Sequence, residues 1–248
     1  MYMMINTPLQ DLVCFFRISD EYQCGNKKNK PDYVTKKGCL LNFLKVFGKT
    51  NVFIIADCCS EDTLRWLSSL ELVIFKTQYK NGARSFLHAV RLAIEYLQAE
   101  QWVYFVEDDY LHVKGCRDVL LEGLDISDYV TLYSHPDKFK NATDGGNPLV
   151  SDNSEETRVY LTKSCHWKLT NSTTMTFATT VKILKDDYNI MTHFCSGAYP
   201  EDFRMFRYLI EQKKRKLISS IPGYSSHMET AHLSPLVDWE KESKNILQ

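Results

Sequence analysis

Three consecutive acids, Glu107, Asp108 and Asp109, follow an apolar segment in the stretch WVYFVEDDYLH at 102–112. Adjacent carboxylates repel one another, and a bound divalent cation removes that penalty. Carboxylate oxygens, phosphate oxygens and water are the ligands that hold Mg²⁺ or Mn²⁺ on a nucleotide. Acids after a strand are also common turn formers, because Asp bonds to its own backbone. The tripeptide therefore predicts either a metal site or a plain turn.

The spacing of the three acids predicts which of their side chains can face the same ligand. In an extended segment the side chains of Glu107 and Asp109 point the same way and that of Asp108 points the other way. We therefore expect Glu107 and Asp109 to serve one ligand, while Asp108 faces a different neighbour.

Polar residues also follow the other short apolar runs of the first half. Ligands of open α/β sheets bind outside the carboxyl ends of the strands, so residues in these places are expected to line one crevice. Any one of them taken alone is equally a turn residue. They are Arg17, Asp57, Gln78, Asn81 and Gly82.

A second acidic pair, Glu201 and Asp202, lies in the stretch SGAYPEDFRMFRYL. Pro200 is expected in the first turn of a helix, which places both carboxylates at the positive end of the helix dipole. A carboxylate kept ionised in this way can act as a general base. Acids in a first helical turn are also very common without any catalytic role.

Two histidines, His227 and His232, lie in the stretch GYSSHMETAH, for which no helix or strand is expected. An imidazole nitrogen is a frequent metal ligand. A histidine in a loop is more often a surface residue, so both interpretations stay open.

The composition is typical of a soluble globular protein, with 44% hydrophobic and 25% charged residues. A net charge of −1 gives no global attraction to nucleic acid or to an anionic membrane. No apolar run approaches the length of about 18 residues that a membrane span needs, and the first ten residues lack the order of a signal peptide. We expect a cytoplasmic protein with reduced cysteines; a peripheral membrane contact through the basic run 213–216 stays open.

The first half alternates short apolar runs with amphipathic segments, which predicts a mainly parallel sheet flanked by helices. The expected strands are 12–16, 51–57, 72–75 and 102–106. The expected helices are 31–48, 60–70 and 83–98, the first of them opening at Pro31.

The second half is less regular. Residues 140–158 are rich in Gly, Pro, Asn, Asp and Ser, which predicts a long mobile loop. A strand is expected within 173–181 and a helix at 200–216. Because no linker or repeat interrupts the chain, we expect a single domain spanning 1–248.

These pieces, in this order, resemble the glycosyltransferases of the GT-A fold, which transfer a sugar from a nucleotide-sugar to an acceptor. VEDDY is similar to the Glu-Asp-Asp variant of their metal motif. SGAYPED resembles their glycine-containing loop and xED motif, and His227 resembles the histidine that often completes the metal site. The resemblance covers the chain from about Leu12 to His227.

The resemblance implies a Rossmann-like GT-A fold with a nucleotide-sugar-binding half at about 1–112 and an irregular acceptor-binding half at about 113–248. It implies that Asp109 and His227 hold Mn²⁺ or Mg²⁺ and that Asp202 is the catalytic base. Glu107 would reach the ribose or a metal-bound water. The implied donor-binding residues are Arg17, Asp57, Asn81, Arg84, Glu107 and Asp108.

The expected activity is therefore inverting transfer from a nucleoside-diphosphate sugar, with a UDP-sugar favoured, to a hydroxyl of a glycan or other acceptor. The sequence departs from the motif by having Glu107 as its first acid, and His232 is a rival to His227. One alternative is a scaffold that binds a nucleotide-sugar without turnover. Another is a sugar-phosphate nucleotidyltransferase, although the expected Gly-rich phosphate loop does not follow the first strand.

Overall fold

A computed structural model describes residues 12–21 and 29–244, which divide into two compact units. Unit 1 consists of residues 12–21, 49–108 and 175–214, and unit 2 of residues 29–48, 109–174 and 215–244. The expected single domain with a boundary near residue 112 stays a prediction. No helix within the described residues is long and apolar enough to cross a membrane.

The mainly parallel sheet expected from the first half is confirmed and forms the centre of unit 1. Its strands are ordered β3-β2-β1-β4-β9, with β9 antiparallel to β4 and the others parallel. The central strand β1 is buried along its whole length, which explains why it reads as an unbroken apolar run. The strands are β1 (Val13–Ser19), β2 (Val52–Asp57), β3 (Val73–Thr77), β4 (Trp102–Glu107) and β9 (Phe177–Thr180).

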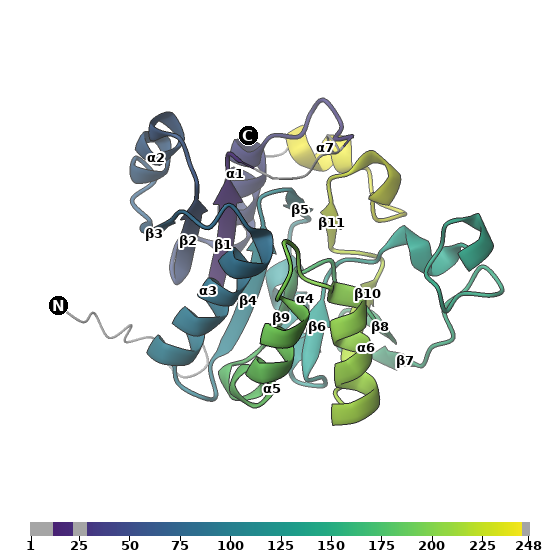
Figure 1. Cartoon of the computed structure of the whole chain (residues 1–248). Helices are drawn as coiled ribbons and strands as arrows, with labels where there is room; N and C mark the ends of the chain where they lie inside the picture. Colours follow the sequence, from purple (N-terminus) through teal and green to yellow (C-terminus); the bar gives the residue numbers. More distant parts are fainter. Residues whose placement is uncertain (1–11, 22–28, 245–248) are drawn as a thin grey trace. The chain divides into compact units, whose positions relative to one another are not determined.

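A cluster of aromatic rings packs helices against this sheet. Phe105 of β4 lies between the rings of Phe15, Phe86 and Phe177, at centroid distances of 5.8, 5.5 and 5.6 Å. Phe177 also contacts Phe206 at 5.3 Å. Figure 1 shows α3, α5 and α6 on the same face of these strands. The helices of unit 1 are α2 (Glu61–Ser68), α3 (Gly82–Tyr96), α5 (Val181–Phe194) and α6 (Asp202–Lys213).

Unit 2 contains four strands ordered β6-β10-β8-β7 and a separate antiparallel pair, β5 and β11. Gly123 of α4 lies against the buried Trp167, and a Cβ atom at this position would come within 2.7 Å of the indole ring. The elements are β5 (Tyr110–His112), β6 (Tyr129–Thr131), β7 (Val159–Leu161), β8 (His166–Leu169), β10 (Leu217–Ile221), β11 (Ser225–His227), α1 (Lys36–Phe47), α4 (Cys116–Leu124), α7 (Trp239–Lys244) and the 3-10 turns η1 (Pro136–Phe139), η2 (Ala142–Asp144) and η3 (Thr230–His232).

Two expected helix starts are wrong. The first helix begins at Lys36, not at Pro31, because the hydroxyl of Thr35 accepts a hydrogen bond from the N–H of Gly38 and caps it there. The later helix, α6, begins at Asp202 with Glu201 as its capping residue, so Pro200 precedes the helix.

The segment 140–158 has no strand and only the 3-10 turn η2, as its composition predicts. Hydrogen bonds nevertheless connect residues within this segment and link the segment to neighbouring residues. The side chains of Asn141 and Asn153 each accept a hydrogen bond from the other residue's backbone N–H, and the N–H of Glu155 donates to the carbonyl of Lys138. Its mobility stays a prediction.

Candidate functional site

Arg17 and Glu107, both expected to bind the donor, form an ion pair in unit 1. The two residues are register partners on β1 and β4, so both lie toward the carboxyl ends of parallel strands. Arg17 Nη2 is 2.5 Å from Glu107 Oε1, and Nη1 donates to the carbonyl of Gly82 at 3.0 Å. The guanidinium therefore neutralises Glu107 and joins the strand ends to the start of α3.

Asp108 is fully buried, and its Oδ2 atom accepts a hydrogen bond from the backbone N–H of Ser19 at 3.0 Å. The carboxylate thus links the end of β4 to the end of β1. Residues 108 and 109 form a turn, so the extended alternation predicted for Glu107, Asp108 and Asp109 stops at Glu107. A direct donor contact by Asp108 stays a prediction.

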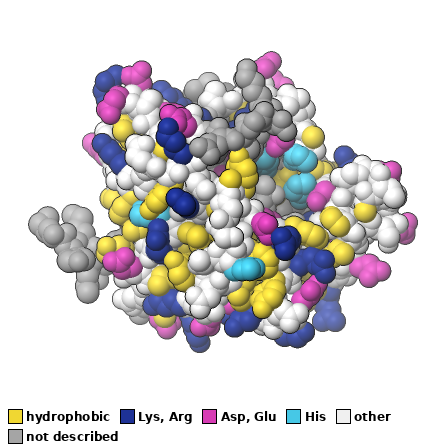
Figure 2. Space-filling view, viewed as in Figure 1, with side chains coloured by type: hydrophobic (Ala, Val, Ile, Leu, Met, Phe, Trp, Pro, Cys, Tyr) yellow, Lys and Arg dark blue, Asp and Glu magenta, His cyan; other side chains and the backbone are white. Residues whose placement is uncertain are grey.

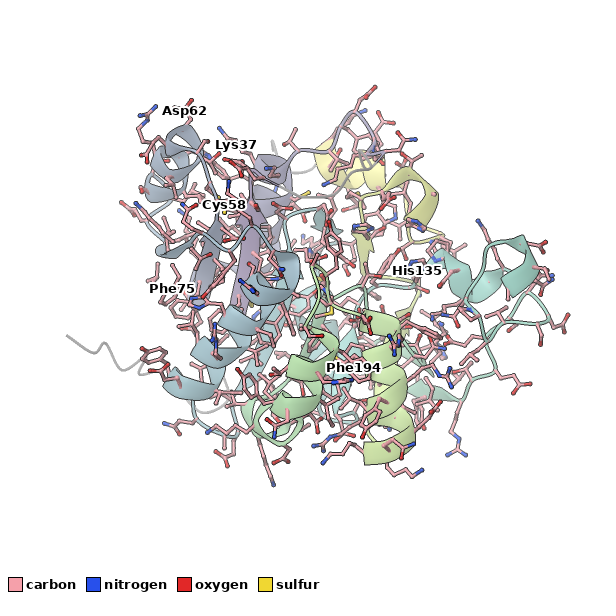
Figure 3. The ribbon with its side chains drawn as sticks, in the orientation of Figure 1. Lys37, Cys58, Asp62, Phe75, His135 and Phe194 are labelled. Atoms are coloured by element: carbon pink, nitrogen blue, oxygen red, sulfur yellow. The ribbon has the colours of Figure 1, made fainter. Side chains whose placement is uncertain are left out.

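Asp57 at the end of β2 is 4% exposed, and one carboxylate oxygen organises the loop after β3. Oδ1 accepts hydrogen bonds from Thr77 Oγ1 at 2.9 Å and from the N–H of Tyr79 at 2.7 Å. Cys58, labelled in Figure 3, follows in a left-handed conformation with φ of 54°. Burial raises the pKa of its thiol, and the neighbouring Asp57 charge adds to the rise. Asp57 therefore holds a strained turn at the strand edge.

Asn81 caps α3 by accepting a hydrogen bond from the N–H of Arg84 at 2.9 Å. Its amide nitrogen donates to the carbonyl of Gly197 at 3.2 Å, so the glycine-containing loop lies beside the start of α3. The side chain of Arg84 is exposed. A role for either residue in donor binding stays a prediction.

Asp202, the expected base, is the first residue of α6, and its Oδ1 atom accepts a hydrogen bond from the N–H of Met175 at 3.1 Å. Cys195 lies within electrostatic reach of both Asp202 and Arg17. Burial raises the pKa of its thiol to about 12; the Arg17 charge opposes the rise, and the charges of Asp202 and Glu201 add to it. Within unit 1, the Cys195 thiol is therefore influenced by the charges of both Asp202 and Arg17.

In unit 2, Asp109 and His227 are paired. His227 Nε2 is 3.2 Å from Asp109 Oδ2, and both side chains are only 3–4% exposed. The expected irregular segment around His227 is wrong: His227 ends β11, which pairs with β5 so that His227 faces Tyr110. The N–H of Met228 also donates to the carbonyl of Asp109 at 2.7 Å. Backbone pairing therefore fixes the imidazole beside the carboxylate.

His232, the rival metal-ligand candidate, lies further out. Its side chain is 41% exposed, and Nε2 is 3.9 Å from Glu229 Oε1. Its ring lies 5.2 Å from that of His135, which is labelled in Figure 3, and Figure 2 shows histidine side chains gathered at this surface. Burial lowers the pKa of His232, and the His135 charge adds to the effect.

The Asp109–His227 pair fits a divalent cation by the chemistry of its donors. One carboxylate oxygen and one imidazole nitrogen suit Mn²⁺, whereas Mg²⁺ prefers oxygen alone. Within the described residues, no group of three or more His, Cys, Asp or Glu side chains is arranged to hold a metal. The remaining ligands would therefore be phosphate oxygens and water.

Several residues that matter to this geometry carried no signal in the sequence. Lys30 Nζ lies 3.1 Å from Asp109 Oδ2, yet it is one of several lysines in a polar stretch. Cys195 and Met175 approach Asp202 only through the fold. For Glu229, the spacing of two residues from His227 was the only available hint.

The comparisons show resemblance in three dimensions but not in sequence. No protein-family model and no curated protein sequence matches the chain. Among solved structures, 4-diphosphocytidyl-2C-methyl-D-erythritol synthase from Anaerococcus prevotii is 10% identical, with a TM-score of 0.49 and coverage of 97% of each chain.

Two further solved structures are similar, the second of them over a smaller part of both chains. CTP:phosphocholine cytidylyltransferase from Streptococcus pneumoniae is 9% identical, with a TM-score of 0.49 and coverage of 96% of this chain and 99% of that one. Residues 1–349 of TarS from S. aureus are 18% identical, with a TM-score of 0.41 and coverage of 71% and 49%.

Proposed function

We propose that the chain is an inverting, metal-dependent glycosyltransferase that moves a sugar from a nucleoside-diphosphate sugar, with a UDP-sugar favoured, to a hydroxyl of a glycan or other acceptor. One observation carries the proposal. The acid two residues after β4, Asp109, lies with its Oδ2 atom 3.2 Å from His227 Nε2, at a place almost closed to water. A carboxylate and an imidazole so placed are suited to hold one cation.

Asp109 and His227 would hold the cation together with the diphosphate of the donor. A bound Mn²⁺ supplies positive charge where negative charge develops on the leaving diphosphate. The low exposure of both side chains strengthens every electrostatic interaction at this place. Arg17, fixed by Glu107 and the carbonyl of Gly82, is the proposed contact to the ribose or base of the donor.

Asp202 is the proposed base. An acceptor hydroxyl is a poor nucleophile at neutral pH, and a carboxylate within hydrogen-bond reach takes its proton as the oxygen attacks the anomeric carbon. The bond from that carbon to the donor phosphate breaks on the opposite face, so the anomeric configuration inverts. Asp202 is the first residue of α6, where a carboxylate interacts favourably with the helix dipole, and the N–H of Met175 fixes one of its oxygens.

A second candidate function is a scaffold that binds a nucleotide-sugar without turnover. The ammonium of Lys30 lies 3.1 Å from the same oxygen of Asp109 and gives that carboxylate a cationic partner without any metal. Sugar-phosphate nucleotidyl transfer is a third candidate, which a product assay distinguishes.

The test is release of nucleoside diphosphate from a panel of nucleotide-sugars in Mn²⁺ and in EDTA, with Asp109→Asn and Asp202→Asn beside the wild type. Glycosyl transfer predicts Mn²⁺-dependent release that both variants lose. Donor binding without release from any sugar would establish the scaffold instead. Release of pyrophosphate from a nucleoside triphosphate and a sugar phosphate would establish the nucleotidyltransferase.

A further inference from the structure

The ion pair between Lys30 and Asp109 occupies the place that the proposed metal needs. Lys30 Nζ is 3.1 Å from Asp109 Oδ2, and His227 Nε2 is 3.2 Å from the same oxygen. The Asp109 side chain is 3% exposed and that of Lys30 is 27% exposed. The partly exposed Lys30 therefore places its ammonium on an oxygen of a carboxylate that is nearly closed to solvent.

Lys30 is held near Asp109 by its backbone. The carbonyl of Asn29 accepts hydrogen bonds from both the N–H and the hydroxyl of Thr230, each at 2.8 Å. Thr230 follows Glu229, whose carboxylate is 3.8 Å from His227 Nδ1. Three residues upstream of Thr230, His227 is itself fixed in β11. The lysine thus belongs to the same bonded assembly as the two proposed metal ligands.

We infer that Lys30 is a resident counter-ion of Asp109 that competes with the divalent cation, so the metal and the donor diphosphate bind cooperatively. A cation that binds Asp109 Oδ2 must displace the ammonium, because two positive charges cannot share one oxygen at about 3 Å without strong repulsion. Metal binding to the free protein is therefore weakened. A diphosphate supplies new negative charge to both the metal and the displaced lysine, and each ligand then raises the affinity for the other.

This inference rests on the proposed function, since it takes Asp109 as a metal ligand. The test is calorimetric titration of MnCl₂ into the protein with and without UDP, which needs no turnover. In the wild type, UDP should raise the affinity for Mn²⁺. In Lys30→Met, the affinity of the free protein for Mn²⁺ should rise roughly 10-fold, the worth of about 1.4 kcal/mol, and the UDP effect should shrink.

Two controls separate competition from simple loss of charge. Lys241→Met removes an exposed lysine of the same unit and should leave both affinities unchanged. Lys30→Arg keeps a cation at the site and should stay close to the wild type. Equal behaviour of Lys30→Met and Lys241→Met would overturn the inference.

The failure of the inference and that of the proposed function have different signatures. If Asp109→Asn binds Mn²⁺ as tightly as the wild type, Asp109 is no metal ligand and both fail. The wild type could instead fail to bind Mn²⁺ both with and without UDP, while Lys30→Met binds it. The competition would then stand and the metal-dependent function would fail, because the native lysine keeps the metal out.

Discussion

His112, at the end of β5, should make the protein markedly less stable in mild acid. Its side chain is fully buried against the rings of Phe43 and Phe47, each with a centroid 5.4 Å away. The backbone of His112 is fixed separately, since the Asn42 side chain bonds to its N–H at 2.8 Å and its carbonyl at 2.9 Å. Burial lowers the pKa of the imidazole from 6.5 to about 3. The neutral ring is therefore part of the folded structure.

The sign and size of the effect follow from proton linkage. Between pH 6.5 and 3 the unfolded chain binds a proton at His112 that the folded protein does not bind, so the free energy of unfolding falls as the pH falls. Well above pH 6.5 both states hold His112 neutral, and the free energy of unfolding no longer depends on its protonation. One pH unit is worth about 1.36 kcal/mol, so a drop from pH 7.5 to pH 4.5, two units below the unfolded pKa, removes roughly 2.7 kcal/mol. That is a large share of the roughly 5–15 kcal/mol by which proteins are stable.

The assay is urea unfolding followed by tryptophan fluorescence at pH 7.5 and pH 4.5. His112→Phe keeps an aromatic ring in the pocket and leaves the Asn42 bonds to the backbone possible, but it cannot take up a proton. The variant should lose roughly 2–3 kcal/mol less than the wild type between the two pH values. His166→Gln, which changes an exposed histidine of the same unit, should behave as the wild type. An equal loss in His112→Phe and wild type would refute the buried neutral histidine.

Three more predictions concern the candidate site and its surroundings. Asp109→Asn should weaken UDP binding in Mn²⁺ by more than about 10-fold and change it little in EDTA; equal calorimetric affinities in Mn²⁺ would refute the metal ligand. Asp202→Asn should bind donor normally but transfer sugar roughly 10²–10⁴-fold more slowly, and near-normal turnover would move the base elsewhere. Glu155→Ala leaves the buried Lys168 without its carboxylate and should cost about 3–5 kcal/mol in urea unfolding, far more than loss of the exposed Glu240.

The elements that could be predicted are those whose signal lies within a short stretch of the sequence. Three of the four parallel strands of unit 1, β1, β2 and β4, are buried along most or all of their length and appear as short apolar runs. The edge strand β3 is only partly buried, but its run 72–75 is apolar as well. The start of α2 could be predicted from Ser60, a typical capping residue, whose hydroxyl accepts a hydrogen bond from the N–H of Thr63. The position of Arg17, Asp57 and Glu107 at strand ends followed from the same runs.

What could not be predicted depends on contacts between distant residues. β5 and β11 have three residues each, too few to show a period, and exist because they pair with one another across more than 100 positions. His227 consequently looked like a loop residue and proved to be buried. Lys30 likewise meets Asp109 only through the fold, and no local pattern distinguishes it from its neighbouring lysines.

The expected mobility of 140–158 was argued from composition, and the structure shows anchors that composition hides. Glu155 lies between two buried lysines, Lys138 and Lys168, within 3.9 Å of the first and in hydrogen-bond contact with the second. Buried charges need such partners. A single buried carboxylate can therefore anchor one end of a segment that is poor in apolar side chains, and the mobility of the rest of 140–158 stays a prediction.

The alternation of the chain between the two units governs the order in which they can be completed during synthesis. Unit 1 lacks α6 until residue 214 has been made, and unit 2 lacks β10, the strand between β6 and β8, until residue 221. In β10, Leu217 pairs with Tyr129, which is made 88 residues earlier. A nascent chain that ends near residue 200 therefore exposes unpaired strand edges in unit 2 and the α6-covered face of Phe177 in unit 1. Because each unit is built from three separate segments, neither unit can be expressed alone by truncating the chain at a single position.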